Sequence, residues 1–164
     1  MRKGISTTGF GLAVVLAVVS AYGCSTLQED VSLSPDETAL PAYGLVPPQQ
    51  AYDIIGALYD DPTFVLLDLR TDPEVSAGHI SRATNLDFYS TTFASRLSAL
   101  DRNAKYLIYC RTGNRTGQAY NTMMSLGLES VYELDGGITD WIAQGLPVCV
   151  GELSPEHACI APAR

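Results

Sequence analysis

Residues 105–124 read KYLIYCRTGNRTGQAYNTMM, and this stretch decides the fold of the chain. It opens with a predicted strand, Lys105 to Tyr109, whose last four residues form an apolar run of the kind found in strands that are covered on both faces. From Thr116 onward, apolar residues recur at helical spacing. A polar loop that contains Cys110 separates the two segments. The stretch therefore predicts a strand, a loop and a helix in direct succession.

The same alternation continues on both sides. The other patterned segments are helices at residues 47–60, 91–100 and 136–145 and strands at Phe64–Leu69 and Ser130–Leu134. The last two helices are expected to turn inward Ala119, Tyr120, Met123 and Met124, with Gly127 as C-cap, and Ile138, Trp141 and Ile142. Alternating strands and helices predict a parallel sheet with helices on both faces, whose functional loops follow the C-terminal ends of strands. The Cys110 loop stands at such a position.

The N-terminus has the layout of a secretory signal. Two basic residues open the chain, an apolar stretch runs from Gly9 to Val19, and small residues precede Cys24. Residues 1–23 are therefore predicted to be a signal peptide. An uncut signal anchor is the alternative, but the apolar stretch is shorter than the ~20 residues that span a bilayer.

Residues 20–24, SAYGC, resemble the lipobox of bacterial lipoproteins, in which Cys24 would carry the lipid. Ser25, in place of an aspartate, resembles lipoproteins that are sorted to an outer membrane. We expect an exported, periplasmic protein that meets the membrane only through this anchor, and a secreted form cut at the same bond stays open. The formal charge of −8 makes nucleic acid or an anionic membrane surface a poor partner.

Export also governs the other cysteines, because spare thiols pair in an oxidising compartment. Cys149 and Cys159 are separated by a short polar stretch, so we expect a disulfide that pins the C-terminal tail, residues 149–164. With Cys24 at the N-terminus, Cys110 is left as a free thiol that is a candidate for reactivity. A metal site is disfavoured, since the chain has no C-x-x-C pattern and only two histidines.

The loop favours a thiolate at Cys110. Its backbone N–H groups and the start of the next helix supply partial positive charge, and Arg111 and Arg115 supply full charges. Gly113 allows close backbone approach and Asn114 tolerates unusual dihedral angles. These groups predict a depressed pKa for the Cys110 thiol. The alternative is an inert core cysteine at a strand end.

Three ordered stretches carry a family resemblance: residues 66–88 (LLDLRTDPEVSAGHISRATNLDF), 106–120 (YLIYCRTGNRTGQAY) and 131–148 (VYELDGGITDWIAQGLPV). On these stretches, residues 47–148 resemble a single-domain rhodanese, a sulfurtransferase. The resemblance implies a parallel five-stranded sheet flanked by helices on both faces. Residues 24–46 lie outside the resemblance; they are rich in Ser, Thr, Pro and acids and lack periodicity, so we expect a flexible tether. One departure is Ser81-Arg82, which stands where the family usually has proline-glycine.

The resemblance also implies roles for the loop residues. Cys110 would accept a sulfane sulfur, and the persulfide would lie in a cradle made by Arg111, Thr112, Gly113, Asn114 and Arg115. Arg115 would either bind the substrate or pair with an acid such as Asp68, and Arg70 would help to orient an anionic donor. His79 and Trp141 are expected to be structural, and Asp135, Gly136 and Gly137 to shape a neighbouring turn.

The implied reaction moves sulfur from thiosulfate or a similar donor to a thiol, cyanide or protein acceptor, without a metal or organic cofactor. Two alternatives stay open. The first is a non-catalytic module that uses the same fold to bind an anion or a partner. The second is a phosphatase or arsenate reductase of related fold.

Overall fold

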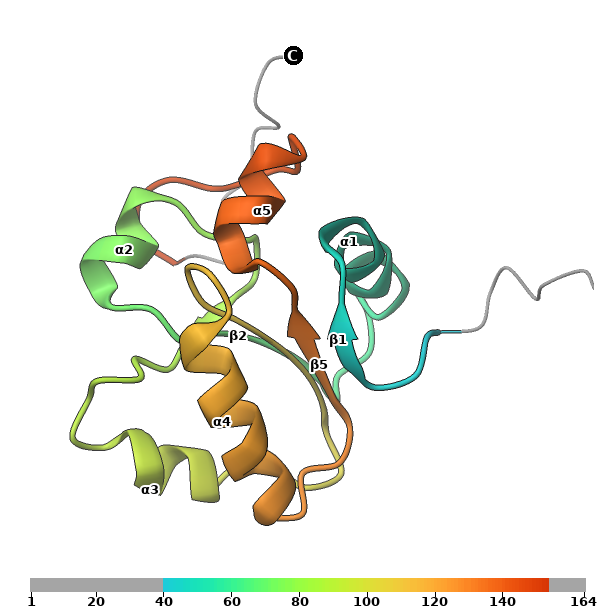
Figure 1. The fold of residues 1–164 in the computed structure, drawn as a ribbon, viewed down its shortest axis with the longest axis vertical. Coiled ribbons are helices and arrows are strands. Elements are labelled where there is room, and N and C mark those ends of the chain that lie inside the picture. Colours follow the sequence, from blue (N-terminus) through green and yellow to red (C-terminus); the bar gives the residue numbers. More distant parts are fainter. Residues whose placement is uncertain (1–39, 154–164) are drawn as a thin grey trace, which may run out of the picture. The chain divides into compact units, whose positions relative to one another are not determined.

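The computed structural model describes residues 40–153, so the expected signal peptide, Cys24 and Cys159 lie outside the described part. The strands are β1 (Gly44–Val46), β2 (Phe64–Asp68), β3 (Thr84–Asn85), β4 (Lys105–Tyr109) and β5 (Val131–Leu134). The helices are α1 (Pro48–Ala57), α2 (Asp72–Ala77), α3 (Phe93–Ser98), α4 (Asn114–Ser125) and α5 (Gly137–Ala143). All five strands are parallel, in the order β1-β5-β4-β2-β3, which confirms the predicted fold class (Figure 1).

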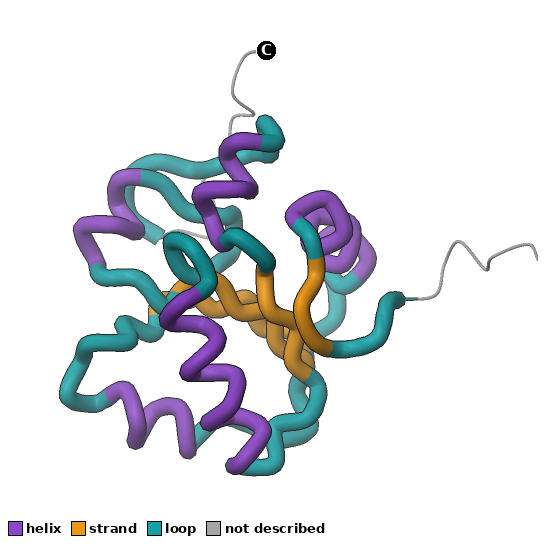
Figure 2. The backbone as a smooth tube through the Cα atoms, in the orientation of Figure 1, coloured by secondary structure: helices purple, strands orange, loops and turns teal. Residues whose placement is uncertain are grey.

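Helices cover both faces of this sheet (Figure 2). One buried cluster joins the sheet to α1 and α5 through residues such as Ile54 and Trp141. The other joins it to α3 and α4 through residues such as Leu97 and Met123. Strands β4 and β5 contribute side chains to both clusters, because successive side chains of a strand point to opposite faces. The loop that follows β4 is therefore supported from two sides.

The inward faces of the last two helices agree in part with the sequence. Ala119 and Met123 are buried on α4, and Gly127 takes a left-handed φ of +81° just after its end, as expected of a C-cap. Trp141 is buried on α5, but Ile142 is 49% exposed, so its predicted burial is wrong. The buried face of α5 is formed by Gly137, Ile138 and Trp141, and Ile142 lies about 100° further round the helix from Trp141.

The first strand corrects the expected domain boundary. Gly44–Val46 belong to β1, although the sequence analysis places them in the tether. Val46 pairs with Leu134 of β5, and the Tyr43 ring lies 4.8 Å from the Tyr132 ring. A three-residue edge strand is too short for a periodic pattern, so only its pairing with β5 reveals it.

The end of the described chain pairs with the segment that follows α2. Cys149 and His79 exchange two backbone hydrogen bonds of 2.8 Å in an antiparallel bridge. Cys149 is disulfide-bonded and its partner lies outside the described residues, so its pairing with Cys159 stays a prediction. None of the helices within residues 40–153 is long and apolar enough to cross a membrane.

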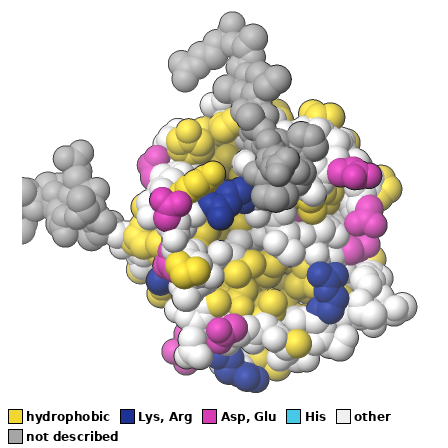
Figure 3. Space-filling view, turned by 180° about the vertical axis from the view of Figure 1, so that it is seen from behind, with side chains coloured by type: hydrophobic (Ala, Val, Ile, Leu, Met, Phe, Trp, Pro, Cys, Tyr) yellow, Lys and Arg dark blue, Asp and Glu magenta, His cyan; other side chains and the backbone are white. Residues whose placement is uncertain are grey.

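Seen from behind, the described surface carries scattered Lys and Arg side chains, with acidic side chains around its margin (Figure 3). Hydrophobic side chains gather across the middle of this face. The visible described surface has no continuous basic patch of the kind that binds nucleic acid.

Candidate active site

The candidate site begins where β4 ends. Cys110 follows Tyr109 directly, is 1% exposed and has a free thiol. Its Sγ accepts the backbone N–H of Gly113 at 3.2 Å. Gly113 caps α4 with φ +100°, a left-handed conformation that favours glycine. This turn starts the helix at Asn114 and directs its first N–H groups toward the sulfur.

The site lowers the pKa of the Cys110 thiol. Burial raises this pKa, but the backbone N–H groups of Thr116, Thr112, Gly113 and Arg115 favour the thiolate more strongly, so the pKa lies below its ordinary value. These are N–H groups of the loop and of the first helical turn, which have no partner within the helix. The direction is the one that the sequence predicts, and its main source is the backbone.

Helix α5 holds the other side of the loop. The backbone N–H of Ile138 donates to the Cys110 carbonyl at 2.9 Å, and the N–H and hydroxyl of Thr139 donate to the Arg111 carbonyl at 3.1 and 2.8 Å. Gly137 makes this approach possible, since a Cβ there would lie 2.6 Å from the Cys110 carbonyl oxygen. With these carbonyls bound to α5, the following N–H groups are free to face the sulfur.

Arg115 pairs with Glu74 of α2. Its two terminal nitrogens lie 2.8 and 2.7 Å from the two carboxylate oxygens of Glu74. The Arg115 guanidinium lowers the pKa of Glu74 to about 2. Of the two expectations for Arg115, the structure gives pairing with an acid, although the acid is Glu74 rather than Asp68.

Asp68 instead pairs with Arg70, and neither side chain reaches the cleft. Arg70 is 5% exposed and its Nε lies 2.9 Å from Asp68 Oδ1. It also donates to the carbonyls of Glu74 at 3.1 Å and Gly78 at 2.7 Å. The expectation that Arg70 orients an anionic donor is therefore wrong. Its role is to attach α2, and with it Glu74, to the end of β2.

A cleft of about 300 Å³ opens above the sulfur, lined by Glu74, Tyr89, Cys110, Arg111, Thr112, Asn114 and Arg115. Tyr89 is exposed, and the Arg115 guanidinium carbon lies 5.6 Å from the centre of its ring. Arg111 is exposed, and within residues 40–153 no carboxylate lies at ion-pair distance from it. The cleft thus offers a partly neutralised arginine and a free one to an anion.

Two residues below the sulfur, Thr116 and Glu133, were not predicted from the sequence to belong to the site. The Thr116 hydroxyl is fully buried and lies 3.9 Å from Cys110 Sγ. The same oxygen lies 2.7 Å from the Gly113 carbonyl and 2.7 Å from Oε1 of Glu133 on β5. Sequence signals for both exist: Thr116 shares the buried face of α4 with Ala119, and Glu133 is the acid of an otherwise apolar strand.

Residues 51–144 match the family described as the rhodanese-like domain, which is more than half of the chain. The chain belongs to the rhodanese-like family. A sulfurtransferase of Allochromatium vinosum is 35% identical over 95 residues, which cover 58% of this chain and 87% of that protein. A rhodanese-related protein of Thermoplasma volcanium has a solved structure with a TM-score of 0.56 and 28% identity, covering 66% of this chain and 99% of that one.

Other relatives differ in length and name. A thiosulfate sulfurtransferase of Pseudomonas fluorescens is 35% identical over 77 residues, covering 47% of this chain and 69% of that protein. A tRNA uridine(34) hydroxylase of Erwinia tasmaniensis is 34% identical, over 57% of this chain but only 29% of its own length. The second relative therefore shares with this chain a domain rather than a whole protein.

His79 is structural in this rhodanese-like domain, as expected. It is buried, and its Nδ1 lies 3.1 Å from the Val75 carbonyl oxygen. It does not line the cleft at Cys110. Within the described part of the chain, no group of three or more His, Cys, Asp or Glu side chains could hold a metal ion.

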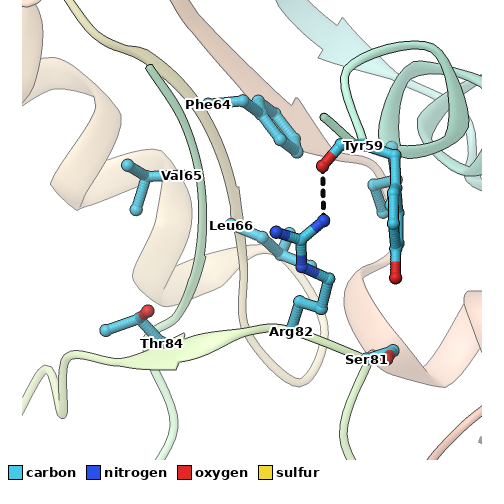
Figure 4. A pocket seen from close by; sticks show the side chains of 8 residues that line it. Tyr59, Phe64, Val65, Leu66, Ser81, Arg82 and Thr84 are labelled. Carbon is cyan, nitrogen blue, oxygen red and sulfur yellow. Dashed lines mark hydrogen bonds between the residues drawn. The ribbon is translucent and has the colours of Figure 1, made fainter. Parts of the chain in front are cut away.

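The departure at Ser81-Arg82 lines a second hollow, of about 150 Å³ (Figure 4). Arg82 takes a left-handed φ of 63°, which costs a residue with a side chain about 1–2 kcal/mol. Its guanidinium lies 4.3 Å from the centre of the Tyr59 ring and donates to the Tyr59 carbonyl. These contacts offset the strain, so the rhodanese-like fold keeps its turn here without glycine.

Proposed function

We propose that this protein is an exported sulfurtransferase that carries sulfur as a persulfide on Cys110. The observation that supports this most directly is the free Cys110 thiol, whose pKa is lowered by the backbone N–H groups around it. A thiolate of this kind is a preformed nucleophile and needs no general base. The similarity to the sulfurtransferase of Allochromatium vinosum adds support, because the match covers 87% of that protein rather than one domain of a longer one.

In the first half-reaction, the Cys110 thiolate attacks the outer sulfur of thiosulfate. The bond between the two sulfur atoms of thiosulfate breaks, and its electron pair leaves with sulfite. Cys110 then carries a persulfide whose negative charge lies on the outer sulfur. The relative named thiosulfate sulfurtransferase favours this donor over other sulfane compounds.

In the second half-reaction, a thiolate or cyanide attacks the outer sulfur, and Cys110 leaves as a thiolate. The lowered thiol pKa helps here too, because a thiol of low pKa is a better leaving group. The acceptor can be a small thiol or a cysteine of a protein. The exposed Tyr89 at the cleft leaves room for either, since it is not covered by other described residues.

Arg111 is the residue that we assign to donor binding. Thiosulfate is a dianion, and Arg111 is the exposed cation of the cleft without a carboxylate partner among residues 40–153. Arg115 lies in the same cleft, but Glu74 holds both of its terminal nitrogens. Its charge therefore acts at a distance, while the position of its side chain is fixed.

The loop length favours sulfur over phosphate. Four residues separate Cys110 from Arg115, and related phosphatases and arsenate reductases resemble this fold with a loop that is one residue longer. A persulfide adds a single sulfur atom, whereas a phosphate brings several oxygens that each seek donors. The shorter ring of N–H groups is suited to the smaller group.

Export and lipidation belong to the same proposal. We propose that residues 1–23 are removed, that Cys24 carries the lipid, and that Cys149 pairs with Cys159 in the periplasm. The signal-like N-terminus and the short stretch between Cys149 and Cys159 motivate this part of the proposal. The residues that carry the rest of this proposal lie outside the described ones.

Incubation with thiosulfate, followed by intact-mass and peptide mass spectrometry, tests the function. We expect the mass of one sulfur atom on Cys110, sulfite in solution, and removal of the sulfur by cyanide as thiocyanate. Cys110→Ser should lose all three signals while it unfolds like the wild type. A protein that binds thiosulfate without forming the persulfide would be a binding module. Cleavage of phosphotyrosine analogues without a persulfide would identify a phosphatase.

A further inference from the structure

A single buried hydroxyl separates the Cys110 sulfur from a carboxylate. Thr116 Oγ1 has one proton, and three acceptors surround it: Cys110 Sγ at 3.9 Å, the Gly113 carbonyl at 2.7 Å and Glu133 Oε1 at 2.7 Å. The two oxygen contacts are short, and the sulfur contact is long. The proton is therefore directed toward oxygen and away from the sulfur.

Glu133 reaches this hydroxyl from below the first turn of α4. It lies on β5 between the buried residues Tyr132 and Leu134, and a Cβ on Gly117 would be 3.7 Å from its Oε1. Within the described residues its carboxylate forms no ion pair, and its side-chain hydrogen bond comes from Thr116. A carboxylate thus lies beneath the helix N-terminus that serves the thiolate.

This position opposes the rest of the site. Loop and helix N–H groups favour a thiolate at Cys110, whereas a nearby negative charge disfavours it. The other charged or titratable groups around the sulfur are Arg111, Arg115 paired with Glu74, Tyr89, and the buried Asp68–Arg70 pair at the end of β2. None of these contacts the Thr116 hydroxyl within residues 40–153. Glu133 is thus the charged group that acts on its proton, beside the neutral Gly113 carbonyl.

We propose that Glu133 is a positioning residue that acts through Thr116 to keep the Cys110 thiolate strongly nucleophilic. By drawing the Thr116 proton away from Sγ, it limits how far the site stabilises the thiolate. The limit matters because intrinsic nucleophilicity of a thiolate falls as its pKa falls, and the best attacking thiol has a pKa near the ambient pH. The effect of Glu133 on the thiolate does not depend on the proposed function. Only the advantage that this effect gives to sulfur transfer rests on that function.

The test is the pH profile of Cys110 alkylation by iodoacetamide, which needs no sulfur donor. In Glu133→Gln, the negative charge is gone, and the Thr116 proton is held away from Sγ only by neutral acceptors, of which the Gly113 carbonyl at 2.7 Å is one. We expect the midpoint of the profile to move down, by on the order of one pH unit. The limiting rate constant at high pH should fall, by about threefold for each pH unit of the shift. Glu129→Gln, which neutralises an exposed acid just before β5, should leave both values unchanged.

Two further variants separate contact from charge. Glu133→Asp keeps the charge but withdraws the carboxylate from Thr116, so it should shift the profile in the same direction as Gln. On a Thr116→Val background, Glu133→Gln should add little. An equal shift on that background would mean that the charge acts through space, and would overturn the role of Thr116. An unchanged or upward midpoint in both Glu133 variants would overturn the proposal.

The outcome is also separable from that of the proposed function. If thiosulfate gives no persulfide on the wild-type protein but the alkylation midpoint still moves in Glu133→Gln, the function fails and the positioning role stands. If the persulfide forms and the midpoint does not move, the function stands and the positioning role fails. Thermal unfolding of each variant identifies any that fails to fold, in which case Glu133→Asp replaces Glu133→Gln.

Discussion

The backbone N–H of Ile138 donates a hydrogen bond of 2.9 Å to the carbonyl oxygen of Cys110. Through this bond, a helix that begins after β5 fixes the peptide bond that follows Cys110, just beyond the end of β4. Gly137 brings the two segments together, because its φ of 60° and its missing side chain permit the approach. The geometry of the loop therefore depends on α5 as much as on its own sequence.

Gly137→Ala should damage both stability and the site. The new Cβ would lie 2.6 Å from the Cys110 carbonyl oxygen, in a left-handed backbone, so we expect a loss of about 2–4 kcal/mol in the free energy of unfolding. Gly145→Ala is the matched control, since its φ is +74° with no atom within 4 Å of the Cβ position. It should lose only about 1–2 kcal/mol. Equal losses in urea unfolding would contradict this account.

Glu74→Gln should change how stability depends on acid. The folded-state pKa of Glu74 is about 2, against 4.5 for a free glutamate, so its contribution is present above pH 4.5 and is lost as the pH falls toward 2. We expect about 1 kcal/mol, because the pair is partly exposed. Lys105 lowers the pKa of Asp61 in the same way, and Asp61 is present in both the wild type and the variant. The measurement is therefore the difference between wild-type and variant unfolding curves at pH 6 and pH 3, which should shrink at the lower pH.

Substitutions of Arg111 and Arg115 should have different effects on thiosulfate binding and on stability. Arg111→Ala removes an exposed charge without a carboxylate partner in the described residues, so KM for thiosulfate should rise about tenfold or more while the unfolding temperature stays unchanged. Arg115→Ala breaks the two bonds to Glu74 and should lower the unfolding temperature as well. Steady-state kinetics with thermal unfolding checks both. A destabilised Arg111→Ala beside an unaffected Arg115→Ala would reverse the assignment.

Non-reducing peptide mapping of the exported protein should find Cys149 joined to Cys159 and Cys110 free. The motive is the short stretch between the first two and the disulfide-bonded state of Cys149. The same digest reports the mature N-terminus, where a diacylglyceryl mass is expected on Cys24. A bridge that includes Cys110 in the resting protein would contradict the pairing, and an intact Met1 would contradict export.

Local patterns predicted those parts of the fold that depend on local sequence. Residues Lys105–Tyr109 became β4 with the same bounds, because the apolar run from Tyr106 to Tyr109 is typical of a strand buried on both faces. β1 was missed because three residues show no period and are fixed only by pairing with β5. Helix α2 was also missed, although Thr71 is followed three residues later by Glu74, a sequence pattern typical of a capping box.

The site divides in the same way. The position of Cys110 and of the N–H groups around it follows from a strand, a loop and a helix that are adjacent in sequence. Glu74 and Glu133 do not, since they reach Arg115 and Thr116 from other elements. Nothing in the sequence around an arginine states which of several acids it will meet, and Asp68 was a reasonable partner until β2 and α2 were placed in space.

The buried guanidinium of Arg70 ties the folding of α2 to that of the sheet. A helix of six residues is too short to persist alone in water. Arg70 bonds to the carbonyls of Glu74 within this helix and Gly78 at its end while it is held by Asp68 at the end of β2. A permanent charge without those partners could not remain buried, so α2 cannot open by itself without also loosening β2. Opening of α2 is thereby coupled to loosening of β2, and the hydrogen-bonded amide of Val75 should exchange more slowly than the first amides of the same helix, which have no partner within it.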